Sequence, residues 1–233
     1  MKIVTWNCNG AFRRKFHLVA DLGADIAVVQ ECEDPSKAGG AYEKWAENHI
    51  WIGKNRNSGL GVFAKNQINL QKLDWNDSAL ELFIPCIVNN DFKLLAVWTK
   101  QGNSHDFRYI GQLWKYLQLH KQALSEHRCV ICGDFNSNTI WDKKHLGWNH
   151  SDVVRELSAI EVLSLYHVMS GDEQGKETIP TFFMQRNKER SYHIDYAFAS
   201  RKLIGERSEV VVGESAHWLT HSDHVPLTFE ISV

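Results

Sequence analysis

Oxygen-bearing side chains stand at the ends of several short apolar runs in this sequence. The run Cys129-Val130-Ile131-Cys132 leads into Gly133-Asp134-Phe135-Asn136, where a carboxylate and a carboxamide lie two residues apart. Asn7 and Glu31 each follow another apolar run, and Asp223-His224 precedes a further one. Because functional groups collect in loops at strand ends, where a rigid sheet holds them, this pattern predicts one polar site assembled from several strand ends.

The oxygen donors of this set suit a hard divalent cation. Mg²⁺ and Mn²⁺ prefer carboxylate and amide oxygens, whereas Zn²⁺ is typically bound by histidine and cysteine. Mg²⁺ also needs few protein ligands, because water and substrate phosphate fill its remaining positions. For each carboxylate taken alone, capping of a turn or helix is the alternative interpretation.

An acid–histidine pair is a second expectation. Asp195 lies inside an apolar and aromatic run, and a buried carboxylate needs a partner because an unpaired buried charge is costly. His224 is a natural candidate, since a carboxylate on one ring nitrogen fixes the tautomer and favours the imidazolium. A purely structural histidine is the alternative, because the chain contains 12 histidines.

Alternating strands and helices must position these residues. Apolar periodicity predicts helices over 12–22, 107–124 and near 151–160. Apolar runs predict strands at 2–6, 25–30, 59–65, 67–73, 79–88, 92–98, 129–132, 180–184, 192–199, 208–212 and 225–231. Mixed strands with helices between them favour sheets covered by helices, and the length fits one catalytic domain over 1–233.

Composition narrows the class of protein. The formal net charge of −2 gives no overall basic field for nucleic acid, although a local basic patch would suffice for docking. No apolar run approaches about 18 residues, so we expect no membrane insertion.

The odd number of cysteines, five, and their place in apolar runs indicate reduced thiols and a cytoplasmic location. Cys129 and Cys132 should point to opposite faces of a strand, which argues against a metal or redox pair. No obligate protein partner is indicated.

Five sequence blocks together resemble the signature of the endonuclease/exonuclease/phosphatase superfamily, the DNase I-like and exonuclease III-like enzymes. In the family's order they are Trp6-Asn7, Gln30-Glu31, Gly133-Asp134-Phe135-Asn136, His193-Ile194-Asp195-Tyr196 and Ser222-Asp223-His224. Each block alone is weak, whereas five in order are specific, and the resemblance covers residues 3 to about 231. It implies an α/β (α+β) fold, a four-layer α/β/β/α sandwich of two mixed sheets flanked by helices.

The resemblance implies hydrolysis of phosphoester bonds that depends on Mg²⁺, with Mn²⁺ as a substitute. Glu31 is then expected as the principal metal ligand, with Asn7 and Asp223 completing or supporting the site. Such a reaction needs a positioned nucleophile and neutralisation of charge on the phosphoryl oxygens.

The resemblance also implies the catalytic groups. Asp134 is expected to orient or deprotonate the attacking water, and Asn136 to contact the phosphate or that water. His224, paired with Asp195, is expected to bind the scissile phosphate and to stabilise its developing charge.

One position departs from the family pattern. Exonuclease III-like members carry a phosphate-contacting tyrosine where this chain has Trp98, and an indole cannot become a phenolate. This departure puts an abasic-site endonuclease assignment in doubt. Phosphate contact would pass to Lys100, Gln101, His105 or Arg108, unless these are ordinary solvated loop residues.

Three functions fit these features: a nuclease for DNA or RNA, a phosphatase or phosphodiesterase for small molecules or lipid head groups, and a non-catalytic binding module. Basic and aromatic residues in the expected rim loops favour the nuclease, because they suit phosphates and bases. They are Arg13, Arg14, Lys143, Lys144, Trp148, Arg186, Lys188 and Arg190. The binding module is the weakest of the three, since every residue that the mechanism requires is present.

Overall fold

Two six-stranded mixed sheets packed face to face form the centre of the structure, a computed structural model that describes residues 1–101, 107–126 and 128–233. The first sheet has the order β13 (Val210–Val212), β14 (Leu227–Glu230), β1 (Lys2–Asn7), β2 (Ile26–Cys32), β4 (Ser58–Ala64) and β3 (His49–Asn55). The second has the order β5 (Leu70–Lys72), β6 (Phe83–Val88), β7 (Phe92–Trp98), β8 (Cys129–Asp134), β12 (Asp195–Ser200) and β9 (Val162–Ser164).

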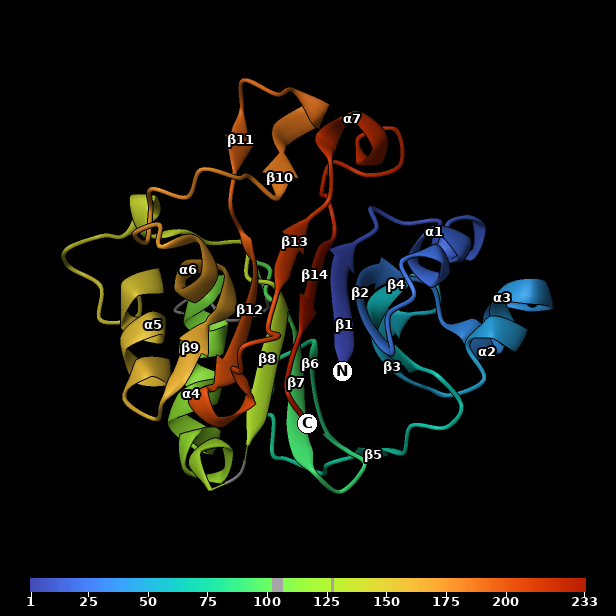
Figure 1. The fold of residues 1–233 in the computed structure, drawn as a ribbon, viewed down its shortest axis with the longest axis horizontal. Helices are drawn as coiled ribbons and strands as arrows, with labels where there is room; N and C mark the ends of the chain where they lie inside the picture. The colour runs from blue at the N-terminus through green and yellow to red at the C-terminus, as the bar shows by residue number, and fades with distance from the viewer. Residues whose placement is uncertain (102–106, 127) are drawn as a thin grey trace.

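Helices cover the outer faces of both sheets (Figure 1). The first sheet carries α1 (Phe16–Asp21), α2 (Pro35–Ala38) and α3 (Gly40–Trp45), and the second carries α4 (Ile110–Ser125), α5 (His150–Ser158) and α6 (Leu165–Ser170). A hairpin of β10 (Phe182–Phe183) and β11 (Ser191–Tyr192) stands with α7 (Ser215–Trp218) at the top of Figure 1, the end toward which β1 runs. Short 3₁₀ helices complete the chain: η1 (Phe12–Arg14), η2 (Thr139–Trp141), η3 (Met184–Arg186) and η4 (Arg201–Leu203). The expected four-layer sandwich is confirmed.

Strand alternation distributes side chains between the layers. In β8, Val130 and Cys132 enter the core between the sheets, whereas Cys129 and Ile131 pack outward with residues of α4 and α5. Cys129 and Cys132 therefore point to opposite faces, as expected, and all five cysteines are buried free thiols. A strand buried on both faces needs apolar residues at nearly every position, which is how the sequence of β8 reads.

Most of the predicted elements are present, with shifted bounds. The helix predicted over 12–22 is divided at Lys15, whose backbone (φ −122°, ψ −8°) leaves the helical region between η1 and α1. The strand predicted over 192–199 is interrupted between β11 and β12, where the N–H of Ile194 donates to the Thr181 hydroxyl. Side-chain hydrogen bonds to the backbone thus divide elements that periodicity alone would continue.

Several short elements have no counterpart in the sequence prediction. The strand β3 lies at a sheet edge and pairs with β4 alone, so three of its seven residues are exposed, none is buried, and its apolar pattern is weak. The helices α2, α3, α6 and α7 contain only four to six residues, too few to show a helical period. The elements that the sequence did not predict are therefore edge strands and very short helices.

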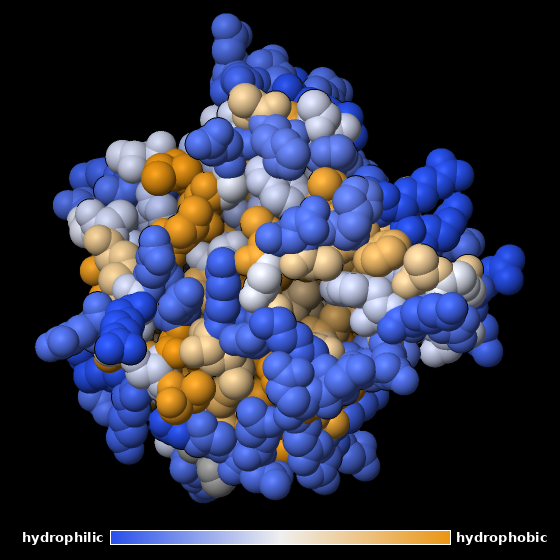
Figure 2. Space-filling view, turned by 45° about the vertical axis from the view of Figure 1, so that its right-hand side comes forward, coloured by the Kyte–Doolittle hydropathy of each residue, from blue (hydrophilic) through white to orange (hydrophobic). Residues whose placement is uncertain are grey.

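The surface is largely polar on the face drawn in Figure 2, where hydrophobic patches appear between hydrophilic side chains. Within the described ranges, no helix is both long enough and apolar enough to cross a membrane.

Candidate active site

The predicted polar residues converge because strands of both sheets end at one rim. Asn7 ends β1 and pairs in parallel with Gln30 of β2, which places Glu31 beside it. Asp134 ends β8 and lies in register with Asp195 at the start of the antiparallel β12. Parallel strands bring their carboxyl ends to the same edge, so residues far apart in sequence meet there.

The backbone around Asp134 depends on a glycine. Gly133 has a φ of +147°, and a Cβ built there would lie 1.8 Å from the carbonyl oxygen of Val97 on β7. Only glycine allows β8 to approach β7 so closely. Glu31 (φ 61°) also lies in the left-handed region, at a bulge in the pairing of β2 with β4. Such a conformation is costly for a non-glycine residue and is a recurrent feature of functional sites.

A hydrogen-bond network joins the carboxylates of the two sheets. The Nδ2 of Asn7 donates to Glu31 Oε1 at 3.1 Å and to Asp134 Oδ2 at 2.9 Å. Asn136 donates twice to Asp134, from its backbone N to Oδ1 and from its Nδ2 to Oδ2, both at 2.8 Å. Asn136 Nδ2 also donates to the carbonyl of Thr99, which fixes the amide in place. Asp134 therefore accepts three hydrogen bonds, two from side-chain amides and one from a backbone N–H.

The electrostatics of Asp134 suit a group that accepts a proton. Burial disfavours its charged form and the nearby Asp195 carboxylate repels it, so that its pKa rises to about 7. The charge of His224 and the hydrogen bond from Asn7 work in the opposite direction. A carboxyl with a pKa near the working pH is well placed for general base catalysis.

The predicted pair of Asp195 and His224 is present and buried. His224 Nδ1 lies 2.9 Å from Asp195 Oδ2, and the N–H of Asp195 donates to Thr181 Oγ1 at 3.0 Å. Burial disfavours the charged form of His224, but the carboxylates of Asp195 and Asp134 outweigh it and raise its pKa to about 9. The ring is therefore an imidazolium at neutral pH, with Nδ1 held by Asp195 and Nε2 left to donate elsewhere.

Sequence reasoning missed the residues that tie the two halves of this site together. Asn9 donates from its backbone to Asn7 Oδ1 at 3.1 Å and from Nδ2 to Asp223 Oδ1 at 2.9 Å. Ser222 donates from Oγ to the carbonyl of Asn7 at 2.8 Å and accepts the N–H of His224 at 3.0 Å. Two features of the sequence could have pointed to these residues. Asn7-Cys8-Asn9-Gly10 is a sequence typical of a turn, and Ser222 belongs to one of the family blocks.

Lys15 is another residue that joins two segments near the site and was not predicted. Its Nζ donates to the carbonyls of Cys8 and His221 at 2.6 Å and 2.7 Å, which ties the loop after β1 to the loop before β14. The backbone interruption between η1 and α1 falls at this same residue.

The donor set fits a hard divalent cation. Asp134, Asp195 and His224 each offer one atom within 4.8 Å of the others. A protonated His224 has no lone pair for a metal, however, so a cation would lie toward Glu31 and Asp134. Asp195 Oδ1 is buried and has no hydrogen-bond partner among the described residues. Carboxylate and amide oxygens are ligands that suit Mg²⁺ or Mn²⁺.

The expected phosphate contacts are only partly brought together. Trp98 is 6% exposed and pairs with Asp134 on the next strand, and Lys100 Nζ lies 4.7 Å from the centre of its ring. Gln101 and Arg108 are exposed. His105 lies outside the described residues.

The basic and aromatic residues expected in the rim loops also fall into two groups, those with a partner inside the protein and those exposed to solvent. Arg13 forms an ion pair with Glu33, and Trp148 packs against Phe107 with ring centroids 6.0 Å apart, so both already have partners within the protein. The other basic residues stay exposed: Arg14, Lys143, Lys144, Arg186, Lys188 and Arg190.

Comparison with known proteins agrees with this architecture. A sequence model described as the endonuclease/exonuclease/phosphatase family matches residues 4–224. Similar solved structures include a 3'-5' exonuclease from Neisseria meningitidis (21% identity, TM-score 0.74), a 3' phosphatase from Neisseria bound to a product DNA hairpin (19%, 0.72) and an AP endonuclease from Archaeoglobus fulgidus (21%, 0.71). Each comparison covers 100% of both chains. No curated protein matches the sequence.

Proposed function

This chain belongs to the endonuclease/exonuclease/phosphatase family, and we propose that it hydrolyses phosphodiester bonds of DNA or RNA with the help of a divalent cation. The observation that carries this proposal is the buried pair of Asp195 and His224 beside the amide-held carboxylate of Asp134. One group is positioned to accept a proton and the other to donate to an anion. Hydrolysis of a phosphodiester by water requires this combination.

Asp134 acts on the attacking water. Asn7 and Asn136 hold its oxygens with three hydrogen bonds, so the carboxylate keeps a fixed direction while its remaining lone pairs face the site. A water bound there is oriented toward the phosphorus and loses its proton to Asp134, whose pKa of about 7 lies close to neutral pH.

His224 binds the phosphate that is attacked. Asp195 fixes the ring through Nδ1, so the Nε2–H of the imidazolium donates to a non-bridging phosphate oxygen. The donor already stands in place before the reaction, which makes its stabilisation of developing negative charge effective.

Glu31, with Asn7, Asp134 and Asp223 around it, would hold Mg²⁺ or Mn²⁺, which when bound neutralises charge on the phosphoryl oxygens. Glu31 and Asp134 share the Asn7 amide, and Asn9 carries the network on to Asp223, so these carboxylates are already arranged as one group.

Lys100 is proposed as the phosphate contact that replaces the family's tyrosine, because its ammonium lies over Trp98 beside the strand end that carries Asp134. Gln101 and Arg108 are proposed to contact the neighbouring backbone phosphates. We further propose that residues 1–233 act as one catalytic domain in the cytoplasm, where the five buried thiols would stay reduced.

A substrate panel tests this function. Plasmid, single-stranded DNA, RNA, abasic duplex, inositol phosphates and sphingomyelin are incubated with Mg²⁺, Mn²⁺ or EDTA. We expect cleavage of nucleic acid that EDTA abolishes, and a loss of orders of magnitude in Glu31→Gln and His224→Ala with an unchanged circular dichroism spectrum. Hydrolysis of inositol phosphates or sphingomyelin alone would contradict the choice of substrate. Near-normal cleavage by either variant would contradict the site.

A further inference from the structure

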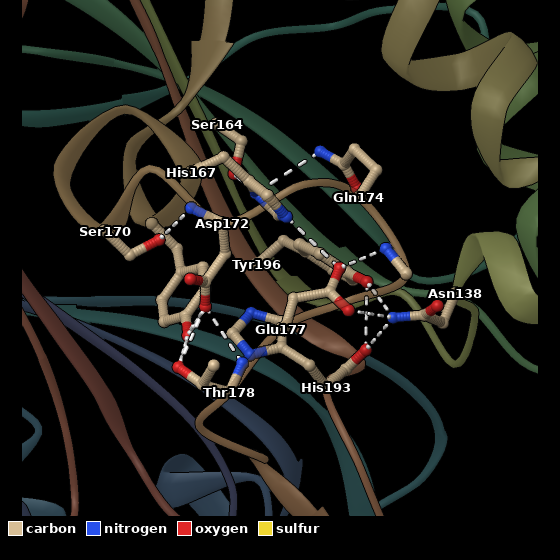
Figure 3. Close-up of polar contacts among 12 residues, drawn as sticks. Asn138, Ser164, His167, Ser170, Asp172, Gln174, Glu177, Thr178, His193 and Tyr196 are labelled. Carbon is tan, nitrogen blue, oxygen red and sulfur yellow. Dashed lines mark hydrogen bonds and ion pairs between the residues drawn. The ribbon is translucent and has the colours of Figure 1, made fainter.

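A buried asparagine outside the five sequence blocks, Asn138, joins the segments that carry Asn136 and Asp195. Asn138 is 2% exposed and lies four residues after Asp134. Its Nδ2 donates to the carbonyl of His193 at 3.0 Å, and His193 lies two residues before Asp195 (Figure 3). One side chain therefore connects the loop after β8 to the backbone that enters β12.

The orientation of the Asn138 amide is fixed by the groups around it. Its Oδ1 accepts the N–H of Ile140 at 3.1 Å, which begins η2. Its Nδ2 faces three oxygens: the His193 carbonyl, Glu177 Oε2 at 3.0 Å and the Tyr196 hydroxyl at 3.1 Å (Figure 3). Because Tyr196 donates its own proton to the His193 carbonyl at 2.9 Å, its oxygen accepts from the amide. This position therefore requires a side chain with an acceptor on one side and N–H donors on the other.

The backbone that leads into Asp195 is held by contacts with two other segments. The Thr181 hydroxyl accepts the N–H groups of Ile194 and Asp195, both at 3.0 Å. The N–H of Phe135 donates to the Ile194 carbonyl at 3.0 Å, and the buried amide holds the carbonyl of His193. These contacts determine where β12 begins, and with it the position of the Asp195 carboxylate.

Asn136 lies between two of these contacts. Phe135 before it and Asn138 after it both bond to the segment that precedes Asp195. The backbone of Asn136 has a φ of +46°, in the left-handed region that residues other than glycine adopt less readily. Contacts on both flanks hold Asn136 in this conformation, in which its Nδ2 donates to Asp134 Oδ2 at 2.8 Å.

We propose that Asn138 is a positioning residue for the hydrolysis, because its amide holds the segment of Asn136 and the segment of Asp195 at one fixed separation. This inference rests on the proposed function, since it acts through the roles given there to these two residues. Asn138 contacts backbone groups, Glu177 and Tyr196, so it acts through the two segments and not on the substrate. A misplacement of about 1 Å can cost about a hundredfold in rate, even when the substitution lies far from the chemistry.

Asn138→Asp tests the donor, because it keeps the size of the side chain and the N-cap of η2 but replaces the N–H donors by a carboxylate oxygen. The new oxygen would face Glu177 Oε2. Burial opposes the charge of Glu177, yet hydrogen bonds from His167 and Asn138 hold its pKa at about 2, so it is ionised at neutral pH. Two carboxylates in such contact repel each other, and the pair takes up one proton as the pH falls. The carboxyl at position 138 then regains an O–H to donate.

The test compares kcat of wild type, Asn138→Asp and Asn138→Ala on the substrate that wild type cleaves fastest, after circular dichroism has shown that each protein is folded. We expect Asn138→Asp to lose at least about tenfold relative to wild type at about pH 8, and to recover most of this loss at about pH 5.5. Asn138→Ala has no proton to gain, so it should lose about tenfold at both pH values. The imidazoles around Glu177, those of His150, His167 and His193, are common to all three proteins, so the ratio to wild type removes their titration.

The Nδ1–H of His224 gives a readout that needs no substrate. Asp195 Oδ2 lies 2.9 Å from this nitrogen, so displacement of the Asp195 segment exposes the proton to solvent. In NMR spectra of the metal-free protein, its exchange with water should become at least about tenfold faster in Asn138→Ala. If Asn138→Ala does not fold, Asn138→Ser replaces it, since serine keeps the N-cap of η2 but is too short to hold the His193 carbonyl.

Asn66→Asp is the matched control, because Asn66 Nδ2 donates to Glu47 Oε2 at 2.9 Å in the same kind of contact on the surface. Asn66 follows β4, which runs antiparallel to β2 and so ends away from the rim of the site. This variant should leave kcat and proton exchange unchanged.

Near-normal kcat and exchange in Asn138→Ala, or an equal loss in Asn138→Asp at both pH values, would overturn the positioning role and leave the proposed function standing. A wild type that cleaves no phosphoester would refute the proposed function, and the exchange of the His224 proton would then decide by itself whether Asn138 positions Asp195.

Discussion

Replacement of Asp195 by asparagine tests whether a buried carboxylate keeps His224 charged. Asp195 is the main group that raises the pKa of His224 to about 9, against burial, which lowers it. Without that charge the pKa should fall from about 9 to about 7, because asparagine keeps the hydrogen bond but not the attraction. The protonated fraction at about pH 8 would then drop from about nine-tenths to about one-tenth, whereas at about pH 6 both proteins stay mostly protonated.

The assay is the ratio of kcat/KM between wild type and Asp195→Asn across this pH range. Loss of ring orientation lowers activity equally at every pH, so it shifts the ratio without changing its slope. Loss of the charge on His224 makes the ratio of wild-type to variant kcat/KM increase about tenfold between about pH 6 and about pH 8. Asp91→Asn, which breaks an ion pair with Arg128, serves as the control, and its ratio of kcat/KM to wild type should not change with pH.

The stability of the protein gives a second readout that needs no substrate. A histidine whose folded pKa is raised from 6.5 to about 9 stabilises the fold fully below about pH 6.5, and this contribution is lost as the pH rises through about 9. At about 1.4 kcal/mol per pKa unit the full effect is about 3 kcal/mol. Titration of the His224 ring by NMR in EDTA measures the pKa directly, and a value near 9 in Asp195→Asn would refute the reasoning.

Three further predictions concern the support of the site. Gly133→Ala should destabilise the fold by about 3 kcal/mol or more in urea unfolding, since its Cβ would meet the Val97 carbonyl at 1.8 Å, and a loss under about 1 kcal/mol would disprove the steric argument. Burial opposes the charge of Glu177, but hydrogen bonds from His167 and Asn138 lower its pKa from 4.5 to about 2, so its contribution is present above about pH 4.5 and lost toward pH 2. Unfolding curves of Glu177→Gln between these pH values should show a weaker acid dependence, and parallel curves for the two proteins would contradict this. The five buried thiols should react with a thiol reagent only when the chain unfolds, and fast labelling of any one in the native protein would count against their burial.

The fold was predictable where residues alternate between two buried layers. The long apolar runs at 25–30, 92–98 and 129–132 all became strands, because a strand covered on both faces leaves little choice of residue. The strand β3 was not predictable, since an edge strand is half solvated and its residues are set by few neighbours. The predicted helix is divided at Lys15, whose side chain makes a tertiary contact to His221 that local periodicity does not encode.

The sequence predicted that these polar residues would lie together, but not the hydrogen bonds that join them. The resemblance supplied Asn7 as a metal ligand, yet its amide lies as a donor between Glu31 and Asp134, so its metal role stays a prediction. The connecting residue Asn9 was missed, because its place between Asn7 and Asp223 arises only when two strand ends meet. Hydrogen bonds between distant segments leave no periodic signal in sequence.

The two segments that are proposed to be catalytic share one buried support, which limits how either can change. Asn138 lies two residues after Asn136, and His193 lies two residues before Asp195, so the buried hydrogen bond between Asn138 and His193 joins the two segments that are proposed to be catalytic. A substitution at Glu177 would loosen this bond and with it the loop that holds Asn136.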